Sequence, residues 1–155
     1  MSRFQGFKAS RSQGFKVSGA AGVRGLGKEG ILARSYRDLL VWQKAKGLAV
    51  ELYRHTEHFP PSETYGLTNQ LRRAGISVAS NIAEGQGRLT RGEFRQFLGH
   101  ARGSLLEIDA QLFIALELRY FSNAQYELLE QKAYEVLGLL NRLLTSLNEP
   151  QDAGE

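Results

Sequence analysis

Residues 122–147 read SNAQYELLEQKAYEVLGLLNRLLTSL, and this stretch indicates the fold class. Ser122 followed three residues later by Gln125 is the capping-box pattern that starts a helix. The apolar side chains that follow recur every three or four residues, which places them on one face of an α-helix: Tyr126, Leu129, Ala133, Val136, Leu137, Leu140 and Leu144. The stretch therefore predicts an amphipathic helix that ends at about Leu147 and packs its apolar face against other helices.

Two further helices are predicted upstream of this one. Thr90 and Glu93 form a second capping box, which opens a helix that runs to about Arg119. Ser62 is suited to cap a helix that continues to about Gly85, because a serine hydroxyl accepts hydrogen bonds from the free N–H groups of a first turn. The glycines around residue 86 then mark the end of that helix.

The first helix is predicted from about Asp38 to His58, and Pro60-Pro61 ends it because proline cannot continue a helix. Four helices of roughly 20–30 residues with short connections place successive helices antiparallel to one another. The sequence thus predicts an all-α protein, an up-down-up-down antiparallel four-helix bundle. Residues 35–149 form this bundle, and residues 150–155 are a polar C-terminal tail.

The positive charge of the 155-residue chain is concentrated at its N-terminus. Residues 1–34 contain seven Lys and Arg, one Glu and seven of the 17 Gly, without apolar periodicity. Such a segment buries too little apolar surface to offset its ordering entropy, so we expect a disordered basic tail. The tail is interpreted as a nucleic-acid-binding arm, a solvated tail, or translated upstream sequence from a misplaced start. The rest of the chain has a slight excess of acids.

Arginine is the one charged residue type that gathers in a single part of the predicted bundle. At 100° per residue, three of these arginines lie within about 40° of one another on the predicted third helix. Repulsion between neighbouring like charges is offset when an anion, or an acid from another helix, lies opposite. The candidate nucleic-acid-binding residues are Arg72, Arg73, Arg88, Arg91, Arg95 and Arg102.

Two interpretations of this arginine cluster stay open. Nucleic-acid phosphate is a suitable anion, because a guanidinium binds it with two parallel hydrogen bonds. Alternatively, Glu84 and Arg88 form an i,i+4 ion pair, and the other arginines meet acids such as Glu107, Glu127 or Glu130.

Small residues form stripes on the two central helices. Gly75, Ala79 and Ala83 are four residues apart, and so are Gly99 and Gly103. A glycine inside a helix costs about 1 kcal/mol relative to alanine, so each position needs a local reason. Close approach of a neighbouring helix is the simplest reason, either within the bundle or between subunits.

Several function classes lack support in the sequence. The absence of Cys excludes disulfides and thiolate metal sites, and no apolar run approaches the length of a membrane span. The three histidines show no Glu-x-x-His pattern, and His55 and His58 fall at the end of a helix, so no metal site or cofactor is expected. No nucleophile has a base at a suitable spacing. We therefore expect a cytoplasmic, non-enzymatic protein without a small-molecule substrate.

Four sequence blocks resemble one family. Residues 38–45 (DLLVWQKA), 65–74 (YGLTNQLRRA), 77–85 (SVASNIAEG) and 101–107 (ARGSLLE) are similar, in this order, to the 23S rRNA intervening-sequence proteins of bacteria. The resemblance covers about residues 36–147. The motif residues that it indicates for family-specific packing or interfaces are Trp42, Gln70, Ser77, Asn81, Glu84, Gly85 and Gly103.

The resemblance implies a four-helix bundle, a ring-like homopentamer and, through relatives that serve diversity-generating retroelements, nucleic-acid binding. The matched Arg72-Arg73 pair and the block around Asn81 and Glu84 would either bind RNA or build the ring. Our first hypothesis is a homo-oligomeric bundle that binds structured RNA or DNA. The alternative is a protein-interaction scaffold or regulator without nucleic-acid affinity.

Overall fold

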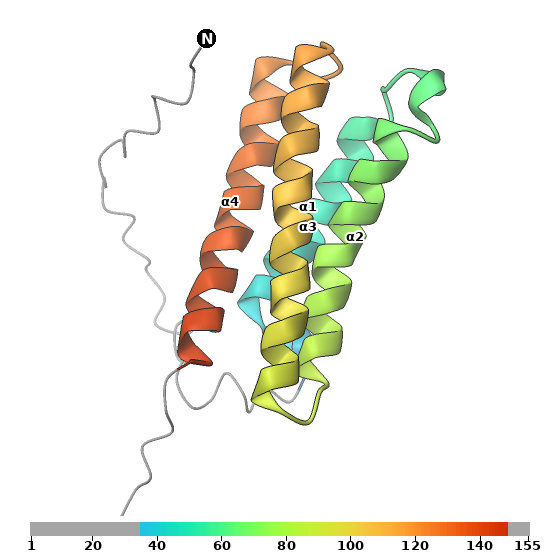
Figure 1. The fold of residues 1–155 in the computed structure, drawn as a ribbon. Helices are drawn as coiled ribbons and strands as arrows, with labels where there is room; N and C mark the ends of the chain where they lie inside the picture. The colour runs from blue at the N-terminus through green and yellow to red at the C-terminus, as the bar shows by residue number, and fades with distance from the viewer. Residues whose placement is uncertain (1–34, 149–155) are drawn as a thin grey trace, which may run out of the picture.

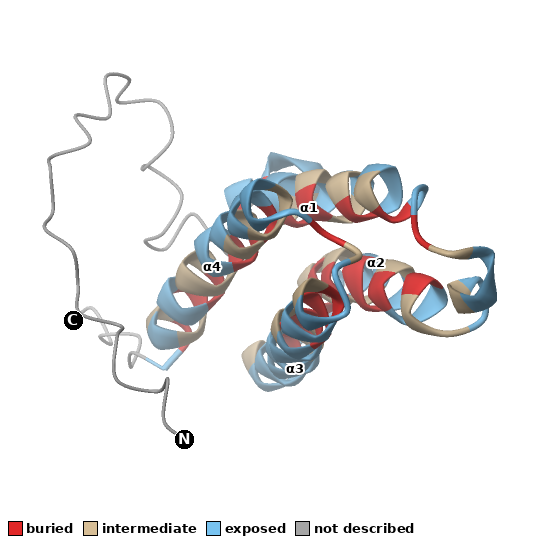
Figure 2. Ribbon diagram, turned by 90° about the horizontal axis from the view of Figure 1, so that it is seen from above, coloured by how far each residue is buried: buried red, intermediate tan, exposed pale blue. Residues whose placement is uncertain are grey.

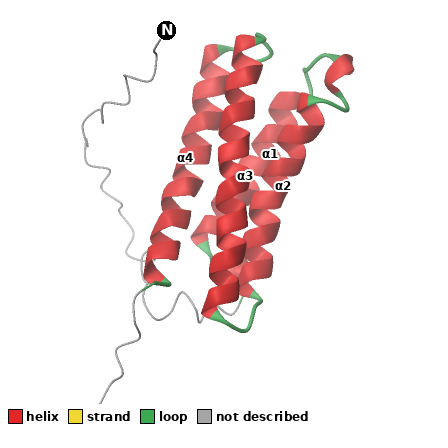
Figure 3. Cartoon of the chain, in the orientation of Figure 1, coloured by secondary structure: helices red, strands yellow, loops and turns green. Residues whose placement is uncertain are grey.

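The computed structural model describes residues 35–148, and within this range it contains helices and no strands (Figures 1 and 3). The predictions for residues 1–34 and for the C-terminal tail lie outside the described residues. Two short 3-10 helices, η1 and η2, precede α1 and α2. The elements are η1 (Tyr36–Asp38), α1 (Leu40–Thr56), η2 (Pro61–Glu63), α2 (Leu67–Gln86), α3 (Arg91–Glu117) and α4 (Asn123–Ser146).

The four helices form the predicted up-down-up-down antiparallel bundle, in which each helix lies beside two others. Helix α2 packs against α1 and α3, and α4 packs against the same two helices (Figure 1). Buried side chains line the inward face of every helix, while the outward faces are exposed (Figure 2). The largest fully buried side chains are Leu48, Leu52, Leu71, Ile82, Leu98, Ile108, Leu112, Leu129 and Leu140.

Both predicted capping boxes are confirmed. The Thr90 side chain accepts a hydrogen bond from the N–H of Glu93, whose carboxylate accepts one from the Thr90 N–H. Ser122 and Gln125 make the same reciprocal pair at the start of α4. Each capping box is four residues long, and these two short stretches are therefore sufficient to fix where α3 and α4 begin.

The predicted start of the second helix at Ser62 is wrong. Ser62 lies inside η2, and α2 begins five residues later, after Gly66. The Glu63 carboxylate accepts a hydrogen bond from the Leu67 N–H at 2.9 Å, so it satisfies one of the free donors of the first turn. The two prolines favour a short 3-10 turn, which delays the longer helix.

For the small residues, packing within the bundle and packing between subunits were both predicted, and the glycines distinguish these two explanations. A Cβ atom at Gly75 would lie 2.9 Å from Leu52 Cδ1 and 3.3 Å from Ala49 Cα, so this glycine serves close packing of α1 against α2. A Cβ atom at Gly99 or Gly103 would have no atom within 4 Å. Packing inside the chain therefore explains Gly75 and does not explain Gly99 or Gly103.

Candidate nucleic-acid interface

Four of the six candidate arginines lie at the two ends of the bundle: Arg72 and Arg73 at one end, and Arg88 and Arg91 at the other. Arg72 lies in α2, and Arg88 lies two residues after the end of this helix. The sixteen positions between them correspond to about 24 Å along the helix axis. We call residues 84–91, where α2 turns into α3, the turn end. The opposite end, where residues 56–73 connect α1 to the first half of α2, is the cleft end. Arg95 and Arg102 lie further along α3, outside both ends.

At the turn end, the positive charge of Arg88 is neutralised. Its guanidinium forms an ion pair with Glu84 one helical turn earlier, as one of the two interpretations predicted. The same guanidinium lies over the ring of Phe97, with Cζ 4.5 Å from the ring centroid. Arg88 is therefore held by a carboxylate and an aromatic face of its own chain.

Arg91 forms a hydrogen bond with the C-terminal end of another helix, α4. Its side chain donates a hydrogen bond to the backbone carbonyl of Ser146 at 3.1 Å, and Ser146 is the last residue of α4. The guanidinium thus meets a carbonyl that α4 leaves free, close to the negative end of the helix dipole. The Arg91 Nε is buried and has no hydrogen-bond partner in the described part of the chain. Arg91 is half-buried and tied to the fold.

Arg95 and Arg102 are exposed on α3. Within residues 35–148, neither side chain forms an ion pair or a hydrogen bond. They do not meet Glu107, Glu127 or Glu130, so that part of the ion-pair interpretation is not realised. Both guanidinium groups remain accessible to an external anion.

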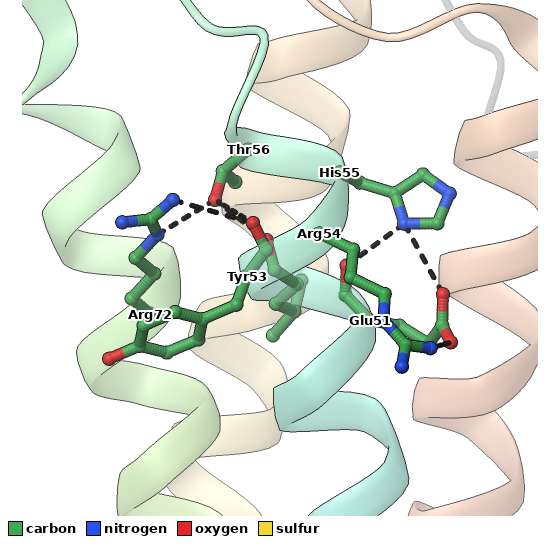
Figure 4. A network of polar contacts seen from close by, with 7 residues as sticks. Glu51, Tyr53, Arg54, His55, Thr56 and Arg72 are labelled. Carbon is green, nitrogen blue, oxygen red and sulfur yellow. Dashed lines mark hydrogen bonds and ion pairs between the residues drawn. The ribbon is translucent and has the colours of Figure 1, made fainter.

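At the cleft end, Arg72 is held by groups that carry no net charge. Its Nε donates a hydrogen bond to Thr56 Oγ1 at 2.9 Å, and a second nitrogen lies 3.4 Å from the Tyr53 carbonyl oxygen (Figure 4). The guanidinium also lies over the Tyr53 ring, 4.6 Å from its centroid. Arg73 is exposed and forms no ion pair within the described residues.

A cleft of about 520 Å³ opens beside these two arginines. Its floor and walls come from the last turn of α1, the loop with Pro60 and Pro61, and the first half of α2. Tyr53, Thr56 and Asn69 add polar atoms to the lining. The volume lies within the range of about 300–1,000 Å³ that is typical of small-molecule sites.

The motif residues of α2 line its contact with α3. Ser77 Oγ lies 2.9 Å from Ser104 Oγ, and this hydrogen bond links the two helices. Asn81 donates from its amide nitrogen to the carbonyl and hydroxyl oxygens of Ser77, so it bonds within its own helix. These motif side chains are used for packing one helix against the next.

Gln70 takes part in a second link between these helices. The buried side chain of Gln111 donates to Gln70 Oε1 at 3.2 Å and to Glu107 Oε1 at 2.9 Å. The side-chain oxygen of Gln111, Oε1, is buried and has no hydrogen-bond partner among residues 35–148. Gln70 and Glu107 therefore position a polar group inside the contact of α2 with α3.

The other motif residues have different surroundings. Trp42 packs edge-on against Tyr36 with the ring centroids 4.9 Å apart, and it contacts the core. At Gly85 a Cβ atom would lie 2.7 Å from Phe97 Cβ, which explains the glycine by close approach of α3. Gly103 faces open space.

Asp109 of α3 and Glu130 of α4 influence each other electrostatically. Burial raises the pKa of Asp109 above its ordinary value, and the nearby Glu130 carboxylate raises it further. Burial also raises the pKa of Tyr126, whose hydroxyl donates a hydrogen bond to Glu130 at 2.7 Å. Neither Asp109 nor Glu130 is among the described residues that line the cleft, and neither forms an ion pair with Arg72 or Arg73.

The described residues hold no cluster of metal ligands and no membrane-spanning helix. No group of three or more His, Cys, Asp or Glu there is placed to hold a metal ion. His55 Nδ1 lies 2.9 Å from the Glu51 carbonyl oxygen, so this histidine is engaged within α1. None of the described helices combines the length and the apolar character needed to cross a membrane.

Sequence reasoning missed Thr56 and Tyr53 as the groups that position Arg72. A signal for Thr56 was present, because it continues the buried stripe formed by Ala45, Leu48 and Leu52 on α1. A polar residue at a core position needs a hydrogen-bond partner. Thr56 Oγ1 donates to the Leu52 carbonyl at 2.7 Å and accepts from Arg72.

The fold and this surface define a class: an antiparallel four-helix bundle with unneutralised arginines on its exterior. The model of the family described as 23S rRNA-intervening sequence protein matches residues 37–142. The chain belongs to this family.

The chain is also similar to a solved structure from Bacteroides thetaiotaomicron, a protein of unknown function from the S23 ribosomal protein family. The TM-score is 0.64 at 22% sequence identity, and the match covers 68% of this chain and 96% of that chain. At this identity the likeness shows a shared fold. No curated protein matches the chain.

Proposed function

We propose that the protein is a non-enzymatic, homo-oligomeric four-helix bundle that binds structured RNA or DNA through its arginines. One observation carries the proposal. Of the six candidate arginines, only Arg88 forms an ion pair with a carboxylate within residues 35–148. An uncompensated guanidinium on a protein surface is available to phosphate oxygens, which it binds by charge-assisted hydrogen bonds.

The outer face of α3 supports the self-association part of the proposal. Gly99 and Gly103 leave open space on this helix, and four apolar side chains on α3 or directly after it are about half exposed: Leu106, Phe113, Ile114 and Leu118. Contiguous exposed apolar surface is typical of protein–protein contacts. Copies joined through such faces would repeat the modest positive charge of each subunit.

The binding test compares two variants with the same change of charge. The first replaces Arg72, Arg73, Arg95 and Arg102 by Gln, and leaves Arg91 in place because it caps α4. The matched control replaces Arg37, Arg54, Arg119 and Arg142 by Gln. Both variants keep residues 1–34, so any contribution of that segment is the same in each.

Affinity for a structured RNA is measured by fluorescence anisotropy over a range of salt concentrations, with circular dichroism as the check on folding. We expect the first variant to lose most of its affinity and to show a smaller salt dependence, because it makes fewer phosphate contacts. The control should retain most of the wild-type affinity. Equal affinities of the wild type and the first variant would remove the bundle from nucleic-acid binding.

The self-association test uses light scattering after size-exclusion chromatography. Gly103→Glu places a charge in the open space on α3, whereas Glu117→Gln removes one from the end of the same helix. We expect the wild type and Glu117→Gln to elute as one oligomer and Gly103→Glu to dissociate. A wild type that is monomeric at all concentrations would contradict the proposal.

The alternative function, a protein-interaction scaffold without nucleic-acid affinity, is favoured by the same apolar face of α3. Purified protein distinguishes the two functions. A nucleic-acid binder retains absorbance near 260 nm, and nuclease treatment changes its size. A scaffold shows neither effect.

A further inference from the structure

We infer that the cleft beside Arg72 binds one unpaired nucleotide, with its phosphate on the arginines and its ring against the wall of the cleft. The inference rests on the proposed nucleic-acid binding and names the kind of nucleic acid. It predicts a preference for loops, bulges and single strands over continuous duplex. The cleft would receive the unpaired nucleotide, while Arg95 and Arg102 would contact the backbone elsewhere.

Arg72 is fixed in place before any ligand binds. Thr56, which is only 2% exposed, directs its hydroxyl oxygen at the Arg72 Nε, and Tyr53 supports the guanidinium from below with its ring (Figure 4). Thr56 is itself held by its hydrogen bond to the Leu52 carbonyl. A guanidinium held in this way loses less conformational entropy when it binds a phosphate than a freely rotating one.

The bonds that hold Arg72 leave its charge and most of its donors unused. A guanidinium has five N–H donors, and the described residues accept from two of the Arg72 nitrogens. Glu51, the nearby acid of α1, is engaged by Arg54 and His55 on a different side of the helix (Figure 4). The remaining Arg72 donors are therefore free for an anion.

The charges that line the cleft favour a phosphate group. Arg72 and Arg73 contribute two positive charges, and among the described residues Glu57 is the only acid in the lining. The Asn69 side chain adds both a donor and an acceptor beside the arginines. The cleft thus carries a net positive charge, while a nucleotide brings one phosphate and polar base edges.

The shape and the apolar part of the cleft favour an unpaired nucleotide. Phe59, Pro60 and Pro61 belong to the lining, and so does Tyr53, which is 40% exposed. Unpaired bases stack on aromatic side chains and on guanidinium planes, whereas the bases of a duplex are already stacked on one another. A duplex would therefore contact the arginines only through its backbone.

The experiment compares two RNA probes of the same stem sequence: a hairpin with an unpaired uridine loop and a blunt, fully paired duplex. Affinities are measured for the full chain by fluorescence anisotropy at fixed salt. We expect the wild type to prefer the hairpin. Arg72→Gln should lower hairpin affinity about tenfold, the typical effect of losing a charge-assisted hydrogen bond, and bring it near duplex affinity.

Three further variants separate the cleft from general electrostatics. Arg72→Lys keeps the charge but loses the forked, stacked geometry, so it should also lose the preference for the hairpin. Arg95→Gln, an exposed arginine outside the cleft, should weaken both probes alike. Glu57→Gln should strengthen hairpin binding, because it removes the one negative charge of the lining.

The outcomes distinguish failure of the inference from failure of the proposed function. Equal hairpin and duplex affinities in the wild type, or equal losses on both probes in Arg72→Gln, would overturn the cleft and leave nucleic-acid binding standing. A wild type that binds neither probe would overturn both. Nuclear magnetic resonance gives a direct check, because the Arg72 Nε–H signal should shift on addition of a short uridine oligonucleotide.

Discussion

The two ends of the bundle use arginine in different ways. At the turn end, Arg88 meets the Glu84 carboxylate and Arg91 meets the last carbonyl of α4. At the cleft end, Arg72 touches a hydroxyl, a carbonyl and an aromatic ring, and no carboxylate within residues 35–148 neutralises it. The same residue type therefore joins helices at one end and keeps its charge available at the other.

This difference shows why a count of arginines says little about binding. A carboxylate partner, such as that of Arg88, weakens the attraction of a guanidinium for phosphate, whereas neutral partners orient the group without cancelling its charge. Stability should therefore depend more strongly on the turn end, and ligand binding more strongly on the cleft end. Substitutions at the two ends should therefore differ in their effects on stability and on affinity.

Gly85→Ala should be the most destabilising of these changes. Its Cβ would lie 2.7 Å from Phe97 Cβ and 2.9 Å from Phe94 Cδ2, so α2 and α3 must move apart. We expect a loss of about 1–3 kcal/mol in the free energy of unfolding, measured by urea denaturation. Gly103→Ala is the matched control. With no atom within 4 Å of its added methyl group, it should not destabilise an isolated subunit.

Arg91→Gln should lower the free energy of unfolding by about 1 kcal/mol, because the Ser146 carbonyl loses its charged donor. The measurement is again chemical denaturation. Affinity for RNA should change little, since Arg91 is half-buried against α4. A large loss of affinity without loss of stability would reverse the roles given to the two ends.

Arg72→Gln should cost less stability than Arg91→Gln, at most about 1 kcal/mol, because the two hydrogen bonds and the ring contact that it removes are partly exposed to solvent. Thr56 keeps its hydrogen bond to the Leu52 carbonyl, so its buried hydroxyl still has a partner. Thermal unfolding of the two variants in parallel checks this order. If Arg72→Gln were the more destabilising, the cleft end would be structural.

The smallest effect is expected from Asp109→Asn, outside both ends. Because burial and Glu130 raise the pKa of Asp109 in the folded state, ionised Asp109 opposes folding above that pKa. The variant should therefore be more stable than the wild type at neutral pH, by less than about 0.5 kcal/mol. As pH falls through the raised pKa, the wild type gains a proton and the difference shrinks.

Below the ordinary value of 3.8, Asp109 is protonated whether folded or unfolded, and the two proteins should be equally stable. Thermal unfolding across this pH range measures the difference. A variant that is less stable than the wild type at neutral pH would contradict the assigned burial cost. RNA affinity should change little, since Asp109 forms no ion pair with any arginine of the described residues.

The sequence predicted those features that depend on residues close together in the chain. Thr90 with Glu93 and Ser122 with Gln125 fixed the starts of α3 and α4, because each capping box is complete within four residues. The start of α2 was missed, since its first N–H groups are served by Glu63 from the preceding 3-10 turn. The i,i+4 pair of Glu84 with Arg88 was likewise foreseen from spacing alone.

Arg91 and Arg72 have hydrogen-bond partners that are far away in the sequence. Arg91 finds Ser146, 55 positions later, and Arg72 finds Thr56, 16 positions earlier. The periodicity of a single helix cannot predict such partners, because distant side chains meet only when the helices pack together. The cleft could not be predicted for the same reason, because it forms between α1, α2 and the loop that joins them.

The most direct measurement compares the RNA affinity of Arg72→Gln with that of Arg88→Gln, both measured for a loop-containing hairpin at the same salt concentration. The two variants lose the same formal charge from opposite ends of the bundle. We predict an approximately tenfold loss for Arg72→Gln and a change of no more than about twofold for Arg88→Gln, whose charge Glu84 already neutralises. Equal losses, or a larger loss for Arg88→Gln, would contradict the division between the two ends.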